Sequence, residues 1–175
     1  MHKIGDNILY GAYGVMTVVD IKEDDITGEV KTYYLLREYG KTNSSVTFVP
    51  FDNEKLILTM QPLLTHDEVI SAFEAASTMA DVDWIPDSRA RGEKYKNILK
   101  NQNRTEILTL IRTIHNTGLR RESIGKKNFL ADENVMLKAE GIILLEFSIV
   151  LGISEAEVRE IIHREVKGAG VAENT

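Results

Sequence analysis

The spacing of apolar residues changes once along this chain of 175 residues, and that change limits the folds open to it. Residues 1–60 hold short runs of β-branched and aromatic residues between turn formers, which is typical of antiparallel strands. From Thr65 onward the apolar residues recur every three or four positions, as in helices. Strands followed by helices predict an α+β protein with domains at 1–61 and 62–167, joined near Gln61 and Pro62.

The first segment predicts four or five short strands. We expect them at residues 7–10, 15–21, 32–37 and 45–50, with a last short one near residues 56–60. Turn formers at residues 26–29 and 39–43 separate the longer ones. Strands this short, with no helical period, favour a small, partly closed antiparallel β-barrel, and an open meander is the alternative.

The second segment predicts five helices. They are expected at about residues 65–79, 87–100, 103–118, 132–151 and 154–167. Thr65 and Ser154 begin capping boxes, and Asn103 is a third N-cap. The helix over 132–151 is apolar on much of its circumference and should lie centrally. Residues 119–131 predict a basic loop, and residues 168–175 a flexible tail.

Positive charge is concentrated in residues 84–127. This segment carries 11 lysine and arginine residues against 4 acidic ones, in a chain whose net charge is −6. A basic block in an acidic protein indicates a partner surface, and phosphate is the partner it favours. An ordinary solvated helix face is the alternative. The candidate nucleic-acid contacts are Arg89, Arg91, Lys94, Lys96, Arg120, Arg121, Lys126 and Lys127.

Trp84 is the only tryptophan, and it begins the basic segment. One interpretation is a core residue that anchors the second helix, as for most lone tryptophans. Its place in a linker, before Pro86 and beside a run of cations, favours another. An exposed aromatic ring flanked by arginine and lysine can stack on a base or wedge between two bases while the cations hold phosphates.

Several kinds of chemistry have no residues to support them in this sequence. There is no cysteine, which excludes disulfides and thiolate sites, and no two of the four histidines are spaced to bind a metal from one helix. Gly11 to Gly14 lacks the third glycine of a dinucleotide loop. We therefore expect no enzymatic activity, no metal site, no cofactor and no small-molecule substrate. No apolar run is long enough to cross a membrane, and no signal peptide is expected, so a cytoplasmic protein is predicted.

The strand segment carries the opposite charge from the basic block, so a phosphate partner is unfavourable there. Its residues Val46, Thr47, Phe48, Val49 and Pro50 form an apolar, β-prone run that ends in proline. Such a run is a candidate edge strand, and edge strands commonly bind another protein by strand addition. The alternative is that both faces of the run are covered within the barrel.

An ordered set of short motifs runs through both segments. It comprises Ile4-Gly5-Asp6, Gly11-Ala12-Tyr13-Gly14, Tyr33-Tyr34-Leu35-Leu36 and Val46-Thr47-Phe48-Val49-Pro50, followed by Trp84, Lys94-Tyr95-Lys96, Met136-Leu137-Lys138 and Leu151-Gly152-Ile153-Ser154. Over residues 3 to about 165 the set resembles the bacterial CarD/CdnL transcription regulators, whose N-terminal module is shared with transcription-repair coupling factor. The stretch between Trp84 and Tyr95 is longer than is usual in that family.

The resemblance implies a Tudor-like barrel that binds the RNA polymerase β subunit, with the run from Val46 to Pro50 as its contact. It further implies that the helical domain contacts promoter DNA at the upstream edge of the transcription bubble, without reading its sequence. Trp84 would wedge into the minor groove, and Lys94 and Lys96 would contact phosphates, which stabilises the open promoter complex. Two alternatives stay open: an adapter that binds protein through both modules, and a hydrolase with a carboxylate site formed by the fold.

Overall fold

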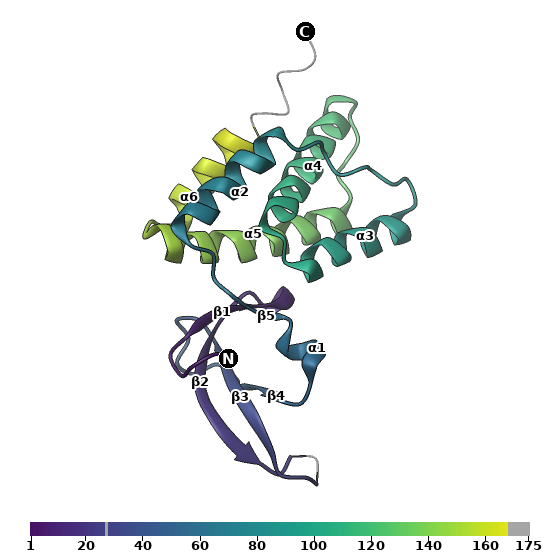
Figure 1. Cartoon of the computed structure of the whole chain (residues 1–175). Helices are drawn as coiled ribbons and strands as arrows, with labels where there is room; N and C mark the ends of the chain where they lie inside the picture. Colours follow the sequence, from purple (N-terminus) through teal and green to yellow (C-terminus); the bar gives the residue numbers. More distant parts are fainter. Residues whose placement is uncertain (27, 168–175) are drawn as a thin grey trace. The chain divides into compact units, whose positions relative to one another are not determined.

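The computed structural model describes residues 1–26 and 28–167 (Figure 1). It divides the chain into two compact units, Met1–Leu63 and Leu64–Thr175. The first holds an antiparallel sheet and the second is helical, which confirms the predicted α+β class. The expected tail at 168–175 lies outside the described residues.

The sheet of the first unit has five strands. They are β1 (Asn7–Tyr10), β2 (Val15–Asp24), β3 (Lys31–Glu38), β4 (Thr47–Pro50) and β5 (Met60–Pro62). Their order in the sheet is β4-β3-β2-β1-β5, and every neighbouring pair is antiparallel. The short helix η1 (Gly11–Tyr13) joins β1 to β2, and Gly14 closes this turn with φ at 80°, a conformation that favours glycine.

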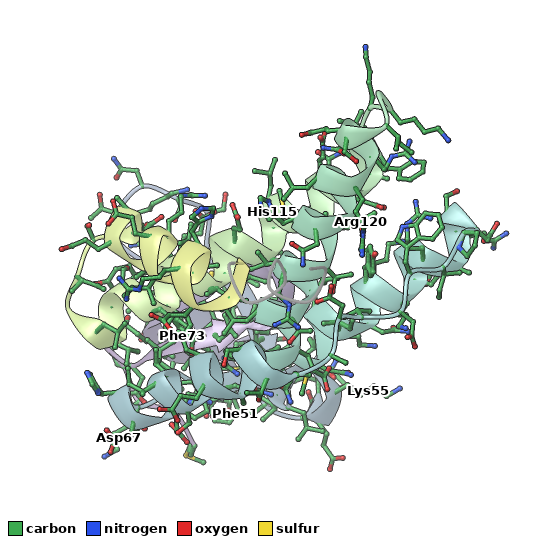
Figure 2. All side chains as sticks on the ribbon, turned by 90° about the horizontal axis from the view of Figure 1, so that it is seen from above. Phe51, Lys55, Asp67, Phe73, His115 and Arg120 are labelled. Carbon is green, nitrogen blue, oxygen red and sulfur yellow. The ribbon has the colours of Figure 1, made fainter. Side chains whose placement is uncertain are left out.

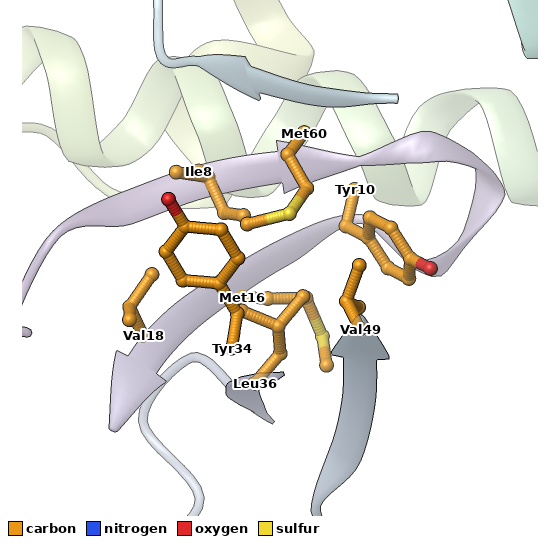
Figure 3. Packing of buried hydrophobic residues seen from close by; sticks show 8 residues of the cluster. All are labelled: Ile8, Tyr10, Met16, Val18, Tyr34, Leu36, Val49 and Met60. Carbon is orange, nitrogen blue, oxygen red and sulfur yellow. The ribbon is translucent and has the colours of Figure 1, made fainter. Parts of the chain in front are cut away.

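The sheet is open, so the predicted closure into a barrel is wrong. The edge strands β4 and β5 are only four and three residues long and lie at opposite ends of the strand order. Between them comes α1 (Glu54–Ile57), at residues where a strand was expected to begin. Its Leu56 and Ile57 cover one side of the core. Figure 3 shows that core: Ile8, Tyr10, Met16, Val18, Tyr34, Leu36, Val49 and Met60.

Among its described residues, the second unit contains five α-helices followed by a π-helix. They are α2 (His66–Thr78), α3 (Ser88–Asn101), α4 (Arg104–Ser123), α5 (Leu130–Leu151), α6 (Glu155–Ile161) and η2 (Ile162–Lys167). As expected, α5 is central: it packs against α2, α3, α4 and α6. Phe147 of α5 meets Phe73 of α2, labelled in Figure 2, edge to face with ring centroids 5.2 Å apart.

Side-chain caps fix the starts of α2, α4 and α6. The capping boxes at Thr65 and Ser154 are both present, and the side chain of Asn103 accepts from the backbone N–H of Glu106, as predicted. The C-terminal end of α5 is capped by Gly152, whose φ of 67° lies in the left-handed region.

The predicted end of α4 near Gly118 is wrong, because the helix continues to Ser123. Gly118 lies inside the helix, where a Cβ atom would come within 3.1 Å of the Asn128 side chain. The glycine therefore allows the returning chain to pass close to α4, and it does not mark a helix end.

Candidate nucleic-acid interface

An extended linker joins α2 to α3, and side chains of α4 hold its first half. Arg112 pairs with Asp81, with 2.7 Å between Nε and the carboxylate Oδ1, and also donates to two carbonyl groups at the end of α2. The hydroxyl of Thr113 accepts from the backbone N–H of Val82 at 2.8 Å. Side chains thus satisfy backbone groups that no helix or strand pairs, and the linker has a defined path.

Trp84 lies in the second half of this linker and is 39% exposed. Its ring stacks beside Phe129, with centroids 6.2 Å apart and an interplanar angle of 28°. The Arg91 guanidinium carbon lies 5.0 Å from the Trp84 ring centroid. The indole is therefore anchored on one side by neighbouring side chains, while more than a third of its surface faces solvent.

A shallow depression of about 400 Å³ adjoins the exposed part of Trp84. Its other lining residues come from the C-terminal end of α4 and the residue that follows: Thr117, Arg120, Arg121 and Ile124. Arg120, labelled in Figure 2, is exposed. An aromatic surface beside two guanidinium groups is the combination that stacks on nucleobases and attracts phosphates.

Three of the eleven cations in residues 84–127 are buried in ion pairs. These pairs are Arg91 with Asp132, Arg104 with Glu146, and Arg112 with Asp81. Each arginine reaches a carboxylate between 31 and 42 residues away in sequence. Part of the basic block is therefore internal structure, neutralised by acids elsewhere in the unit. Arg91 in particular is 1% exposed, so it does not present its guanidinium at the surface where the sequence suggested a phosphate contact.

Apart from Arg91, the cations of α3 are exposed or partly exposed. Lys94 lies 3.7 Å from the carboxylate of Asp83, the residue before Trp84, and Lys96 lies 3.3 Å from Glu93. Arg89 is exposed in the first turn. Exposed pairs of this kind contribute only about 0–1 kcal/mol, so a phosphate can replace the acidic partner at little cost.

The basic segment expected as a loop over 119–131 is partly helical. Arg120 and Arg121 lie in the last turn of α4, where the helix dipole favours cations, and only Lys126 and Lys127 lie in the loop before α5. The two lysines line a separate depression together with Glu122 and Glu133. The structure therefore brings Arg120 and Arg121 beside Trp84, and gives the loop lysines different surroundings.

Phe129, the N-cap residue of α5, is a member of this cluster that sequence reasoning missed. The guanidinium carbon of Arg121 lies 3.8 Å from its ring centroid, and that of Arg91 lies 4.7 Å away. Arg121 also donates from Nε to the carbonyl of Lys127 at 2.8 Å. The available signal was an aromatic residue directly after the cationic loop, but its partner Trp84 lies 45 positions earlier.

Tyr95 lies buried beneath the cluster. Burial raises the pKa of its hydroxyl to about 12, the negative charge of Asp132 acts in the same direction, and Arg91 opposes both. Within the described part of the chain the hydroxyl has no hydrogen-bond partner. Asp132, whose charge acts on this hydroxyl, is itself buried.

In the first unit, β4 is an edge strand, as the sequence predicted. Phe48 is 38% exposed, meets Tyr33 edge to face at 6.0 Å, and has the Lys22 ammonium 5.4 Å from its ring centroid. Val49 points the other way, into the core. Val46 and Thr47 are half-buried, so of this run Phe48 offers the largest apolar surface at the edge.

Among the described residues, no group of three or more histidine or acidic side chains could hold a metal ion. Within those same residues, no helix is long and apolar enough to cross a membrane.

Comparison with known proteins bears on the first unit. Residues 2–64 match the family model of the CarD-like/TRCF RID domain. A comparison with curated proteins finds no match.

Proposed function

We propose, on the premise that the N-terminal unit belongs to the CarD-like family of RNA polymerase-interacting domains, that this protein is a non-enzymatic transcription regulator. In this proposal the first unit binds the polymerase β subunit through β4. The second unit contacts promoter DNA at the upstream edge of the bubble, without reading its sequence, and stabilises the open complex. The protein acts in the cytoplasm, where polymerase and promoter meet.

The observation that carries the DNA half of the proposal is the surface around Trp84. The ring is partly exposed, braced by Arg91 and Phe129, and bordered by Arg120 and Arg121. A braced aromatic ring can insert at a base step in the minor groove, while cations beside it hold the phosphates. The further candidate phosphate contacts are Arg89, Lys94 and Lys96 of α3, and Lys126 and Lys127 of the loop before α5.

Net charge supports recruitment by polymerase in preference to binding of free DNA. Phosphate contacts dominate DNA affinity, and a chain with a net charge of −6 is poorly suited to collect them alone. A polymerase tether raises the local concentration of DNA, so a weak basic surface suffices. Favouring the open state by about 1.4 kcal/mol would change its equilibrium tenfold.

Binding of the full chain to purified RNA polymerase tests the proposal. We expect Phe48→Ala to weaken this binding, because Phe48 supplies the exposed apolar surface of the β4 edge. Tyr13→Ala is the matched control, since it removes an exposed aromatic ring from η1, at a strand pair distant from β4 in the sheet order. Absence of any polymerase binding by the unaltered chain would overturn the proposal.

A further inference from the structure

We infer that Arg91 is a positioning residue, which holds Trp84 in place for DNA and does not itself contact DNA. Asp132 is its anchor on α5. The inference rests on the proposed function in one respect, namely that Trp84 is the group presented to DNA. The position of Trp84 in the free protein can be tested without that premise.

The guanidinium of Arg91 makes hydrogen bonds within the protein through two of its three nitrogens and lies beside the rings of Trp84 and Phe129. Its Nε donates to both carboxylate oxygens of Asp132, at 3.1 and 3.0 Å. One terminal nitrogen donates to the carbonyls of Ile85 and Pro86, at 2.7 and 3.2 Å. Its carbon lies 5.0 Å from the Trp84 ring centroid. One side chain thus ties the two residues after Trp84, and the indole itself, to α5.

Through its hydrogen bonds to the carbonyls of Ile85 and Pro86, Arg91 fixes the second half of the linker between α2 and α3. The first half of the linker is fixed to α4 through Asp81 and Val82. Trp84 therefore lies between this attachment and the one that Arg91 makes. The backbone from residue 81 to residue 85 is neither helical nor in a strand and has no ladder of its own. Without Arg91, the second attachment would be lost and the indole could leave Phe129.

Holding the linker in advance matters for binding. An aromatic side chain on a mobile segment must lose conformational entropy when it inserts, whereas a preorganised one has little left to lose. Arginine suits this role because its planar group stacks on aromatic rings and donates in several directions, whereas lysine offers a single charged point. A lysine in this place would keep the charge but lose the stacking and the fixed donor geometry.

Positioning and direct DNA contact predict different results from the same variants. A phosphate contact would survive Arg91→Lys and would be unaffected by Asp132→Asn, which removes no cation. If Arg91 positions Trp84, both Arg91→Lys and Asp132→Asn should impair function, because each substitution alters one member of the Arg91–Asp132 ion pair. The decisive signal is the accessibility of the indole, and Trp84 is the only tryptophan in the chain.

Acrylamide quenching of Trp84 fluorescence in the free, full-length protein is the first measurement. For Arg91→Lys, Arg91→Gln and Asp132→Asn we expect the quenching constant to rise, by about twofold for the glutamine variant as an indole now 39% exposed becomes free. Arg104→Gln is the control, because it breaks a buried pair of the same kind, with Glu146, away from the linker. It should lower the unfolding temperature and leave quenching unchanged.

The second measurement is the lifetime of the open promoter complex with the same four variants, below their unfolding temperatures. We expect Arg91→Lys, Arg91→Gln and Asp132→Asn to shorten this lifetime while polymerase binding is retained. The control Arg104→Gln should leave the lifetime unchanged. Should Arg91→Gln not fold, Arg91→Lys and Asp132→Asn carry the comparison.

Unchanged quenching in Arg91→Lys and Asp132→Asn would overturn the positioning role, whatever the promoter assay shows. Raised quenching with an unchanged lifetime would keep Arg91 as the holder of Trp84 in the free protein, but would refute its importance for DNA and the proposed role of Trp84. The two failures are therefore distinguishable.

Discussion

Arginines of the same sequence block have different surroundings in this protein: some are buried and others are exposed. Arg91, Arg104 and Arg112 are buried against carboxylates, while Arg89 and Arg120 are exposed. Removing one partner of a buried pair typically costs about 3–5 kcal/mol, because the other charge stays behind uncompensated. Substitution of a buried arginine therefore reports on folding first, and function can be read only from variants that remain folded.

Tyr95 provides a test of burial through pH. Its pKa of about 12 in the folded protein exceeds the usual 10, so the neutral hydroxyl favours folding below pH 10, and this stability is lost as pH rises toward 12. Tyr95→Phe has no proton to lose. We expect urea unfolding to give equal stabilities at pH 7, and a variant about 1 kcal/mol more stable at pH 11.

The exposed Tyr13 supplies the control for this comparison. Tyr13→Phe removes a hydroxyl of the same kind from a ring that is open to solvent. If Tyr95→Phe and Tyr13→Phe lose stability equally between pH 7 and pH 11, the hydroxyl of Tyr95 is not held in its neutral form by burial.

Lys94 and Lys96 test the charge of α3 at its surface. Reversal of both, Lys94→Glu with Lys96→Glu, should reduce the salt dependence of DNA contact within the polymerase complex by about 2 in slope, since each phosphate contact contributes about one counterion. Lys41→Glu with Lys55→Glu changes net charge equally at exposed positions of the first unit and should leave the slope unchanged. Equal slopes for both doubles would make the α3 cations an ordinary solvated face.

At the level of single elements, local signals predicted more than distant ones. The caps at Thr65, Asn103 and Ser154 were predictable because all their atoms lie within four residues. The end of α4 was not, because the reason for Gly118 is the approach of Asn128 across the following loop. The three arginine pairs and the contact of Trp84 with Phe129 were likewise hidden, since their partners meet only in the folded chain.

Closure of the sheet was unpredictable for a related reason. Alternation of apolar residues specifies which side of a strand is buried, but it does not say what covers that side. Here the core of the first unit is completed by Leu56 and Ile57 of α1, within a stretch whose apolar residues also suited a strand. For the candidate site, residue types and charge indicated Trp84 and the cations, while burial decided which of them are accessible.

The cap of α6 can be tested independently of any function. Ser154→Ala removes the side-chain acceptor for the backbone N–H of Glu157, and should lower the free energy of unfolding by about 1 kcal/mol in urea denaturation. Ser123→Ala is the control, since that hydroxyl donates to the Arg120 carbonyl at the C-terminal end of α4. Equal effects of the two substitutions would indicate that the capping box contributes nothing beyond an ordinary surface hydroxyl.

The whole molecule combines a first unit that matches the CarD-like/TRCF RID domain model with a helical unit that presents a braced, partly exposed tryptophan beside arginines. In the proposed function neither unit is sufficient alone to stabilise the open promoter complex. In that proposal the first unit recruits the chain to polymerase, and the second contacts DNA that polymerase brings near. The proposal therefore predicts that any effect on the promoter requires polymerase, because phosphate contacts by a chain with a net charge of −6 are weak without a tether.

The lifetime of the open promoter complex after challenge with a competitor measures this claim most directly. It should be compared for polymerase alone, with the unaltered chain, and with Trp84→Ala at concentrations that saturate polymerase. We predict that the unaltered chain lengthens the lifetime, and that Trp84→Ala stays folded and bound to polymerase yet gives a lifetime near that of polymerase alone. A folded Trp84→Ala that lengthens the lifetime as well as the unaltered chain would contradict the role proposed for Trp84.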